Sequence, residues 1–465
     1  MSQQLNRLTT ASEHRGRAVQ LGTATKESTV RIRTLTAAIS VALLAVTGLA
    51  GCGSGGGSDP NTITYWASNQ GASLQQDRDI LTPELAEFTK QSGIKVNLEV
   101  IPWSDLLDRI TNATTSGAGP DVVNIGNTWS ASLQATGAFV EFDDATLGKI
   151  GGKAKFLETS LSSTGAPGKT ATSVPLYGLS YALFYNKQAF ADAGITSPPA
   201  NWTQFVADAK KLTNPAAGKY GLSLAGASYT ENVHFAFIFG KQHGGNYFDQ
   251  AGNPSFATPQ NVAAIRQYLN LLATDKVTTP GSVENSTTPE AVTDFTAGRA
   301  AMIMGQTGTI TAIATNGMQP SAYGVAPLPI ADPLPPGGER INSHVAGINI
   351  AAFKDKNTDA GLKFINFMTS KAEQVRINQK YSALPVTSDA ATDPIFQNPT
   401  TKIFLDVLRT TSAPMPMVTN EAQFETTVGS GVSSLIAQLV GGKTITDDDI
   451  RATLTAAQQK LTGGG

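Results

Sequence analysis

Cysteine, histidine and charge are all scarce in this chain of 465 residues, and each shortage excludes a class of protein. A single cysteine rules out an internal disulfide, and four histidines leave few donors for a metal site. Charged residues make up 15% of the chain, against a usual content of about 25%, and the net charge is −2. No run of lysine or arginine follows residue 52. We therefore expect no cofactor, no metal and no nucleic-acid partner.

Motifs of ATP hydrolysis and of common hydrolases are also missing. The chain has no GxxxxGK[ST] phosphate-binding loop, so any energy from ATP has to come from another subunit. It has neither the GxSxG motif of serine hydrolases nor the HExxH motif of zinc proteases. These absences favour a binding protein over an enzyme.

The N-terminal part of the chain contains a secretory signal pattern. Arg31 and Arg33 precede an apolar run over 35–50, which ends in small residues. The run falls short of the roughly 20 apolar residues that a membrane-spanning helix needs. Residues 1–29 are polar and of mixed charge, unlike the start of a signal peptide. We therefore expect translation to begin at or near residue 30, so that residues 1–29 are not made.

The end of this signal pattern, Leu49-Ala50-Gly51-Cys52, resembles the bacterial lipobox, in which the cysteine is lipidated and begins the mature protein. The only cysteine lies at the expected cut site and precedes a Gly/Ser-rich tether over 53–60. An ordinary signal peptide with an incidental cysteine is the alternative. We expect residues 1–52 to be the signal peptide with its lipobox. Lipid on Cys52 would anchor the protein at the outer face of the cell membrane.

Strands and helices are expected to alternate after residue 60. The expected strands cover 61–66, 95–101 and 121–125, and the expected helices cover 81–91 and 105–115, followed later by 258–274 and 359–370. Ser104 is the expected N-cap of the second helix. This alternation predicts an α/β fold with a parallel sheet, whose ligands bind at the carboxyl ends of the strands. Those ends are expected at 67–70 and 126–129.

Short segments along the chain follow the order of a known family. They are residues 115–123 with Trp129 and 137–140, 174–175 with 183–187, 201–205, 244–248, 295–302, 323–329, 360–369 and 382–385. Each segment is a loose match alone, but together they cover nearly all of the chain after the signal. The chain thereby resembles the extracellular sugar-binding proteins of ABC importers, in the maltose-binding-protein superfamily.

The resemblance implies two α/β lobes with a ligand cleft between them, the type II, cluster D-like fold of periplasmic binding proteins. The chain would cross the hinge three times, near 177–180, 328–330 and 383–386. Lobe one would comprise 61–178 and 329–384, and lobe two 179–328 and 385–465. Proline-bearing segments interrupt the helix and strand pattern at all three crossings.

The resemblance also implies a function without chemistry. The protein would be the membrane-anchored substrate-binding component of a carbohydrate ABC importer. As a monomer, it would capture a neutral mono- or oligosaccharide by hinge closure. It would then deliver the sugar to the transmembrane permease subunits.

A neutral sugar needs apolar faces for its C–H surfaces and hydrogen-bond partners for its hydroxyls. The candidates near the ends of the first strands are Ser68, Asn69, Gln70, Asp105, Asn127, Thr128 and Trp129. The other candidates are Tyr177, Ser180, Tyr181, His234, Phe235, Gln242, His243, Gln306, Thr307 and His344. Structural roles stay open for some of them: Trp129 could pack on the next helix, and His234 could be a satisfied core histidine.

Two departures from the family concern aromatic side chains. Gln306-Thr307 stands where the family often has a tryptophan that stacks on the ligand, and Phe424 is the nearest aromatic to a missing C-terminal tryptophan. We therefore expect a small or unusually shaped saccharide rather than a long maltodextrin.

Alternative functions keep the fold or change the class. The same fold could bind a polyol or a glycerophosphodiester, although a phosphate group would favour arginine in the cleft. Ferric-ion binders of this architecture typically present adjacent tyrosines, which this chain lacks. A secreted glycosidase needs two carboxylates about 5–10 Å apart across the cleft. Asp105 and Asp121 are possible members, but no acidic partner from lobe two is evident from the sequence.

Overall fold

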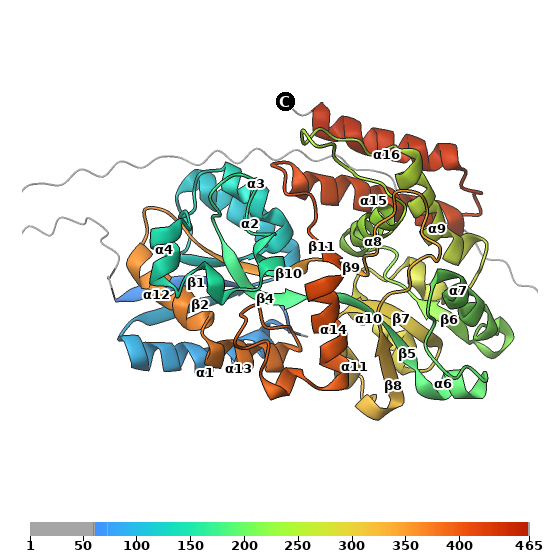
Figure 1. Cartoon of the computed structure of the whole chain (residues 1–465), viewed down its shortest axis with the longest axis horizontal. Helices are drawn as coiled ribbons and strands as arrows, with labels where there is room; N and C mark the ends of the chain where they lie inside the picture. Colours follow the sequence, from blue (N-terminus) through green and yellow to red (C-terminus); the bar gives the residue numbers. More distant parts are fainter. Residues whose placement is uncertain (1–58, 60, 72, 464–465) are drawn as a thin grey trace, which may run out of the picture. The chain divides into compact units, whose positions relative to one another are not determined.

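The computed structural model describes residue 59 and residues 61–71 and 73–463, which belong to one unit (Figure 1). The predicted signal peptide, Cys52 and the predicted tether up to residue 60 lie outside the described residues, except for Asp59.

The strands and helices of this unit alternate along the chain. Its strands are β1 Thr62–Ser68, β2 Lys95–Ile101, β3 Val122–Gly126, β4 Val174–Leu179, β5 Tyr181–Asn186, β6 Tyr220–Ser223, β7 Ala300–Gln306, β8 Tyr323–Ala326, β9 Ser343–His344, β10 Ala346–Ala352 and β11 Ser412–Ala413. Its α-helices are α1 Leu74–Ser92, α2 Trp103–Ser116, α3 Ser130–Ala135, α4 Asp144–Lys149, α5 Glu158–Leu161, α6 Lys187–Asp192, α7 Trp202–Lys211, α8 Tyr229–Gln242, α9 Pro259–Ala273, α10 Thr288–Thr296, α11 Thr309–Thr315, α12 Thr358–Met368, α13 Lys371–Tyr381, α14 Pro399–Thr410, α15 Glu421–Val440 and α16 Asp447–Thr462. Short 3-10 turns are η1 Asn127–Trp129, η2 Lys153–Lys155, η3 Pro215–Ala217, η4 Pro280–Val283, η5 Pro320–Ala322 and η6 Pro394–Phe396.

The first sheet contains the three strands expected at the start of the chain. Its order is β2-β1-β3-β10-β4, and β1 pairs in parallel with both β2 and β3. Strand β10 enters from far along the chain and runs antiparallel to β3 and β4. The parallel pairing predicted for the first strands is therefore confirmed, and the carboxyl ends of β1, β2 and β3 meet at one edge.

Helices bury both faces of this sheet, which explains why every residue of β3 is buried. On one face Tyr65 packs edge-on against Phe364 of α12, with ring centroids 4.9 Å apart. On the other face Trp66 and Val123 belong to a core cluster with Leu106 of α2. Adjacent residues of β1 point to opposite faces, as the two-residue period of a strand requires.

The second expected helix begins earlier than its sequence indicates. Helix α2 starts at Trp103 with Pro102 at the N-cap position, and Ser104 instead donates a hydrogen bond to Asp105. The prediction of Ser104 as N-cap is therefore wrong. Proline is tolerated at such a helix start because the missing N–H has no partner there. As a result, Trp103 lies at the sheet edge rather than in a preceding loop.

The second sheet and its helices form the other large core. The sheet order is β6-β7-β5-β8, with β7 antiparallel to β5 and parallel to β6. Helices α8, α9, α15 and α16 pack together around buried aromatic side chains such as Phe235, Phe239 and Tyr268. Two sheets with helices packed on them make the α/β class that the sequence predicts.

The chain passes between the two sheets at adjacent strands. Strand β4 ends at Leu179 in the first sheet, and β5 begins at Tyr181 in the second. The chain returns between β8 and β10, and α14 then contacts β4, β5 and β8 (Figure 1). Ser180, between the sheets, is buried and donates a hydrogen bond to the carbonyl of Phe404 in α14, at 2.8 Å. Helix α14 thus ties the two sheets together beside this passage.

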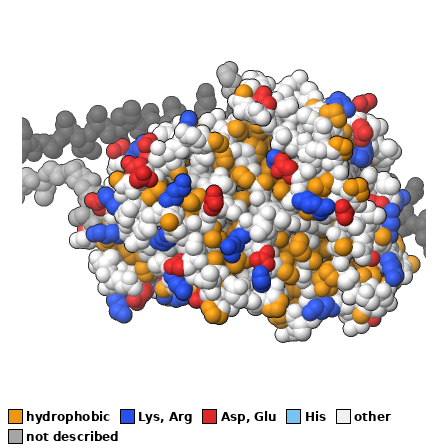
Figure 2. Space-filling model, in the orientation of Figure 1, with side chains coloured by type: hydrophobic (Ala, Val, Ile, Leu, Met, Phe, Trp, Pro, Cys, Tyr) orange, Lys and Arg blue, Asp and Glu red, His pale blue; other side chains and the backbone are white. Residues whose placement is uncertain are grey.

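The drawn face of the molecule carries lysine and arginine side chains interspersed with acidic ones (Figure 2). Among the described residues, no helix is both long and apolar enough to cross a bilayer.

Candidate functional site

A cleft of about 630 Å³ opens where elements of the two sheets face each other. Its lining comprises Asn69, Gln70, Pro102, Trp103, Ser104, Gly126, Asn127, Thr128, Leu179, Ala227, Ser228, Tyr229, Thr230, Glu231, His234, Ser286, Thr287, Thr288, Pro289, Gln306, His344, Ala346, Gly347, Ile348 and Glu425. The ends of β1, β2 and β3 supply one side, and the start of α8, the loop into α10, the end of β7 and α15 supply another. This position matches the rule that ligands bind at the carboxyl ends of parallel strands.

A buried carboxylate shapes the loop after β1. Asp77 of α1 accepts hydrogen bonds from the backbone N–H of Gly71 at 2.8 Å and of Gln70 at 3.1 Å, and from the side-chain amide of Asn69. The Asp77 side chain is fully buried. These bonds hold the loop in the turn that presents Asn69 and Gln70 to the cleft.

The loop after β3 is fixed by packing and by a long-range hydrogen bond. The side-chain amide of Asn127 donates to the carbonyl of Val345 at 2.7 Å, linking η1 to the segment before β10. Gly126 lies under two indole rings, because a Cβ added there would come within 3.0 Å of Trp129 and 3.1 Å of Trp103. Those rings stack with centroids 4.6 Å apart and an interplanar angle of 25°. Glycine at 126 thus allows the stacked pair to lie against the strand end.

Trp103 and Trp129 differ in their relation to the cleft. Trp103 is half-buried and lines it, whereas Trp129 is 3% exposed and lies behind, outside the lining. The indole N–H of Trp129 donates to Oε2 of Glu425 in α15, at 3.3 Å. Trp129 therefore supports Trp103 from below and ties η1 to α15, while Trp103 offers its face to the cleft.

Polar side chains of four elements meet at the floor of the cleft. The Tyr181 hydroxyl donates to Oε2 of Glu231 at 2.9 Å, and it also lies 2.8 Å from Nδ1 of His234. A hydroxyl has one proton to give, so Nδ1 of His234 is the donor to the Tyr181 oxygen. The other ring nitrogen of His234 faces Oε1 of Glu425 at 3.8 Å. The ring of His344 lies beside that of His234, with centroids 4.1 Å apart.

Burial and neighbouring charge set the protonation of this floor. Burial lowers the pKa of His344 well below its ordinary value, and the charge of His234 lowers it further. Burial works against ionisation of Glu425, but the neighbouring His234, with smaller contributions from Thr128 and Glu421, leaves its pKa lowered. Burial, and then the charge of Glu425, raise the pKa of Glu421. Near neutral pH the floor thus holds an ionised Glu425 beside a neutral His344.

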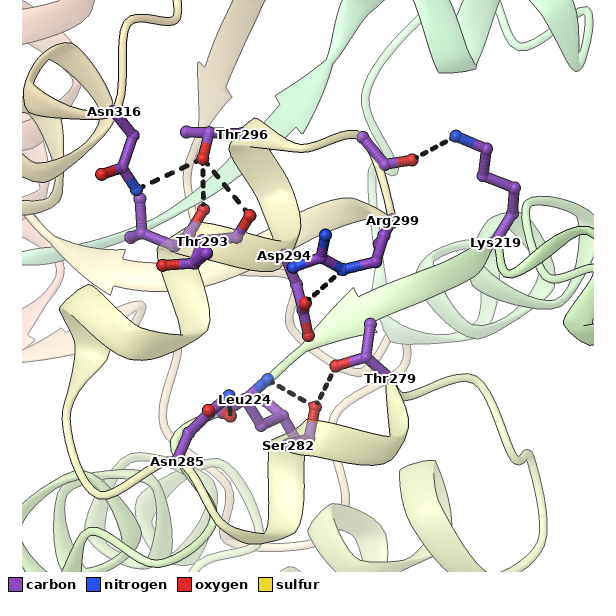
Figure 3. A network of polar contacts seen from close by, with 12 residues as sticks. Lys219, Leu224, Thr279, Ser282, Asn285, Thr293, Asp294, Thr296, Arg299 and Asn316 are labelled. Atoms are coloured by element: carbon purple, nitrogen blue, oxygen red, sulfur yellow. Dashed lines mark hydrogen bonds and ion pairs between the residues drawn. The ribbon is translucent and has the colours of Figure 1, made fainter.

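The loop that carries Ser286 and Thr287 into the cleft is tied to the second sheet (Figure 3). Ser282 accepts a hydrogen bond from the backbone N–H of Leu224 at 3.0 Å, and the side chain of Asn285 donates to the Leu224 carbonyl at 3.1 Å. The same loop ends in a capping box at the start of α10. The network fixes the loop on both sides of its cleft-lining residues.

Comparison with known proteins assigns the family. A profile of the bacterial extracellular solute-binding proteins matches residues 71–375, more than half of the chain. The chain is a bacterial extracellular solute-binding protein.

Relatives of this solute-binding protein agree with the assignment. It is 29% identical over 304 residues to a binding protein of Brucella abortus, covering 64% of this chain and 70% of that protein. It is 27% identical over 300 residues to the diacetylchitobiose-binding protein DasA of Streptomyces coelicolor, covering 61% of this chain and 66% of that one. Its fold matches an ABC-transporter solute-binding protein from Thermotoga lettingae bound with α-D-tagatose. The TM-score is 0.74 at 18% identity, covering 86% of this chain and all of that one.

The solute-binding protein brings several predicted site residues together in the cleft. Those that line it are Asn69, Gln70, Asn127, Thr128, His234, Gln306 and His344. Tyr181 is fully buried and supports His234 from outside the lining. Ser68 and Tyr177 are buried behind the β1 end, with their hydroxyl oxygens 3.3 Å apart.

The other predicted residues lie away from the lining. Phe235 belongs to the core between α8 and α9, and Gln242 is buried, donating to the carbonyl of Ile341 at 2.8 Å. His243 is half-buried, with its Nε2 2.8 Å from the side-chain oxygen of Gln267. The remaining ones are exposed Asp105, which accepts from Ser104, buried Thr307, and Ser180 beside α14.

Among the lining residues that the sequence did not predict, two aromatic and two acidic side chains matter most for this solute-binding protein. Trp103 follows the end of β2, so the strand-end rule that selected Trp129 would also have found it. Tyr229 is 40% exposed at the start of α8. An aromatic residue at a helix start gives no sign of a ligand site in the sequence, and only the position of the cleft shows that Tyr229 lines it. Glu231 and Glu425 come from α8 and α15, far apart in the sequence. No acidic partner from lobe two is evident from the sequence, whereas Glu231 and Glu425, both within the predicted lobe two, line the cleft.

Proposed function

We propose that this solute-binding protein is the substrate-binding component of an ABC importer and captures a saccharide or polyol in the cleft. The observation that carries the proposal is the chemistry of the lining. Trp103 and Tyr229 offer aromatic surface, and the Asn, Gln, Ser and Thr side chains around them offer donors and acceptors. Such a combination suits the C–H faces and hydroxyls of a sugar.

The charge of the lining supports this choice over a phosphorylated ligand. None of the described residues that line the cleft is lysine or arginine, whereas Glu231 and Glu425 are both present. Recognition of a phosphate group normally uses arginine or lysine. A glycerophosphodiester would instead meet two carboxylates, so a ligand rich in hydroxyls fits better.

We propose that binding closes two lobes around the ligand, as the two sheets suggest. The first lobe would comprise 61–178 with the segment from about 346 to 384, and the second would comprise 179–345 and 385–465. The second segment of the first lobe was expected to begin at residue 329. In this division it begins after about residue 345, because Ile341 packs in the core of α8 and α9, and β9 pairs with β11. Contacts from both lobes would make closure dependent on the ligand.

Delivery is also part of the proposal. Lipid on Cys52 would anchor the protein at the outer face of the cell membrane, with the Gly/Ser-rich residues 53–60 as a tether. The ligand-loaded protein would dock on the transmembrane permease subunits, whose partner ATPase supplies the energy.

A thermal-shift screen of the chain from Gly53 onward tests the proposal. Mono-, di- and trisaccharides and polyols are added in excess, because a ligand that binds only the folded state raises the melting temperature by mass action. We expect at least one compound to raise it, and Trp103→Ala to abolish the rise. The control is Trp202→Ala, since Trp202 packs on Phe205 and Phe239 away from the cleft. A panel without any shift would contradict the proposed ligand class.

The two carboxylates of the cleft also permit a check on hydrolysis. A glycosidase needs an acid and a second carboxylate placed across the scissile bond. Here Glu425 accepts from the Trp129 indole and faces His234, an arrangement typical of a fixed binding group. We expect the bound saccharide to be recovered intact after prolonged incubation, as measured by chromatography, and release of shorter sugars would contradict this.

A further inference from the structure

Buried polar atoms at the floor of the cleft lack partners in the protein. His344 is 1% exposed, and neither of its ring nitrogens makes a hydrogen bond of good geometry with a described residue. Oε1 of Glu425 is likewise without a hydrogen bond, although His234 lies 3.8 Å away. Buried polar groups are normally satisfied, so atoms left open beside a cavity indicate where a ligand binds. The floor therefore offers acceptors at Glu425 and at the unprotonated nitrogen of His344.

The same floor has an excess of negative charge. Glu231 accepts from the Tyr181 hydroxyl and acts as a carboxylate, and Glu425 is ionised. Apart from His344, whose pKa burial lowers, His234 is the only basic side chain among the described residues that line the cleft. The charge of His234 can offset at most one of the two carboxylates, and no lysine or arginine of the described residues lines the cleft.

We propose that the ligand carries a basic nitrogen, as in an amino sugar, and that its ammonium group binds at the floor formed by Glu231, Glu425 and His344. This inference rests on the proposed function and specifies the ligand class of the same cleft. The ligand would therefore carry one positive charge, whereas the sequence led us to expect a wholly uncharged sugar.

An ammonium group matches the floor better than a hydroxyl. It has three N–H donors and no acceptor, and the floor presents two carboxylates and a neutral imidazole. It also neutralises charge that closure would otherwise bury, and burying an unpaired charge is costly. A hydroxyl donates one hydrogen bond and leaves the charge in place.

Matched saccharides that differ at one substituent test the proposal in the wild-type protein. The pairs are glucosamine with glucose, galactosamine with galactose, and chitobiose with cellobiose. N-acetylglucosamine and diacetylchitobiose serve as controls that keep the nitrogen but not the charge. We expect at least one amino sugar to bind about tenfold or more tightly than its hydroxyl and acetylated counterparts in calorimetric titration, equivalent to about 1.4 kcal/mol. We expect salt to reduce this advantage.

The outcomes separate the two proposals. If neutral saccharides bind as tightly as their amino counterparts in every pair, the ammonium site is wrong and saccharide binding stands. If no saccharide of either kind binds, both proposals are contradicted.

Two variants locate the site within the cleft. Glu425→Gln and Glu231→Gln keep the side-chain volume and remove the charge, so each is expected to bring the affinity ratio of amino to neutral sugar close to one. Glu158→Gln removes a charge from an exposed helix residue outside the lining and should leave the ratio unchanged. Melting temperatures of the ligand-free variants show that they fold. A ratio that survives in both folded cleft variants would overturn the assignment to this floor.

Discussion

Asp77 is expected to control ligand binding from a position outside the cleft. Its buried carboxylate accepts hydrogen bonds from the backbone N–H groups of Gln70 and Gly71 and from the amide of Asn69. Asp77→Asn keeps the shape but replaces one acceptor oxygen with an N–H₂ group, which would face these donors. The loop after β1 should then leave its turn, displacing the two side chains that reach the cleft.

The size of the effect follows from the bonds that are lost. A hydrogen bond to a charged group contributes about 1.5–3 kcal/mol, so loss of one such bond with partial loss of a second lowers the free energy of unfolding by about 2–4 kcal/mol. We expect the affinity for the saccharide to fall about 10–100-fold, because Asn69 and Gln70 no longer hold their positions. Chemical unfolding followed by tryptophan fluorescence gives the first quantity, and calorimetric titration gives the second.

A matched variant on the same helix makes this test specific. Asp79 is exposed, and among the described residues it accepts a hydrogen bond only from the side chain of Gln75, so Asp79→Asn should change neither quantity appreciably. The reasoning is refuted if Asp77→Asn binds saccharide as tightly as Asp79→Asn does. A loss of stability without a loss of affinity would show that Asp77 supports the fold but does not position the loop.

Three further predictions concern the cleft, a buried carboxyl and the anchor. Tyr229→Ala should weaken saccharide binding about tenfold with little change in stability, because the ring is 40% exposed; equal affinity in titration would show that it does not contact the ligand. Burial, and then the charge of Glu84, raise the pKa of Glu373 to about 7. This carboxyl therefore contributes its full stabilisation at pH values below its unfolded pKa of 4.5, and the contribution is lost as the pH rises through 7. Unfolding curves across this range should show a smaller decline for Glu373→Gln than for wild type, and parallel curves would contradict the shift. Cys52→Ser should abolish incorporation of labelled palmitate and release the protein into the medium, whereas labelling that persists would place the lipid elsewhere.

The fold could be predicted further than the site. Local patterns locate β1, β2 and β3 within about two residues, because β-branched and alternating residues depend little on distant parts of the chain. Strand β10 could not be placed between β3 and β4 by such patterns. Its pairing with β3 joins segments more than two hundred residues apart, and nothing local encodes it.

Site residues were predictable where the strand-end rule applies. Asn69, Gln70, Asn127 and Thr128 follow β1 and β3 and line the cleft. The choice between two tryptophans was beyond the sequence, because Trp103 and Trp129 stack and only their depth decides which one lines the cleft. Glu425 lies near the start of α15, on its buried face, and nothing in the local sequence shows that this carboxylate reaches the cleft. Its role depends on how α15 packs against η1 and α8.

Closure around the ligand is the central claim, and the absence of cysteine after residue 52 makes it directly measurable. Thr111→Cys in α2 and Glu284→Cys beside the cleft-lining loop place spin labels at two exposed positions on opposite sides of the proposed hinge. Pulsed electron resonance then measures the distance between them with and without the tightest-binding saccharide. We predict a shorter and narrower distance distribution in the presence of the saccharide. An unchanged distribution under conditions where calorimetry shows saturation would contradict capture by closure.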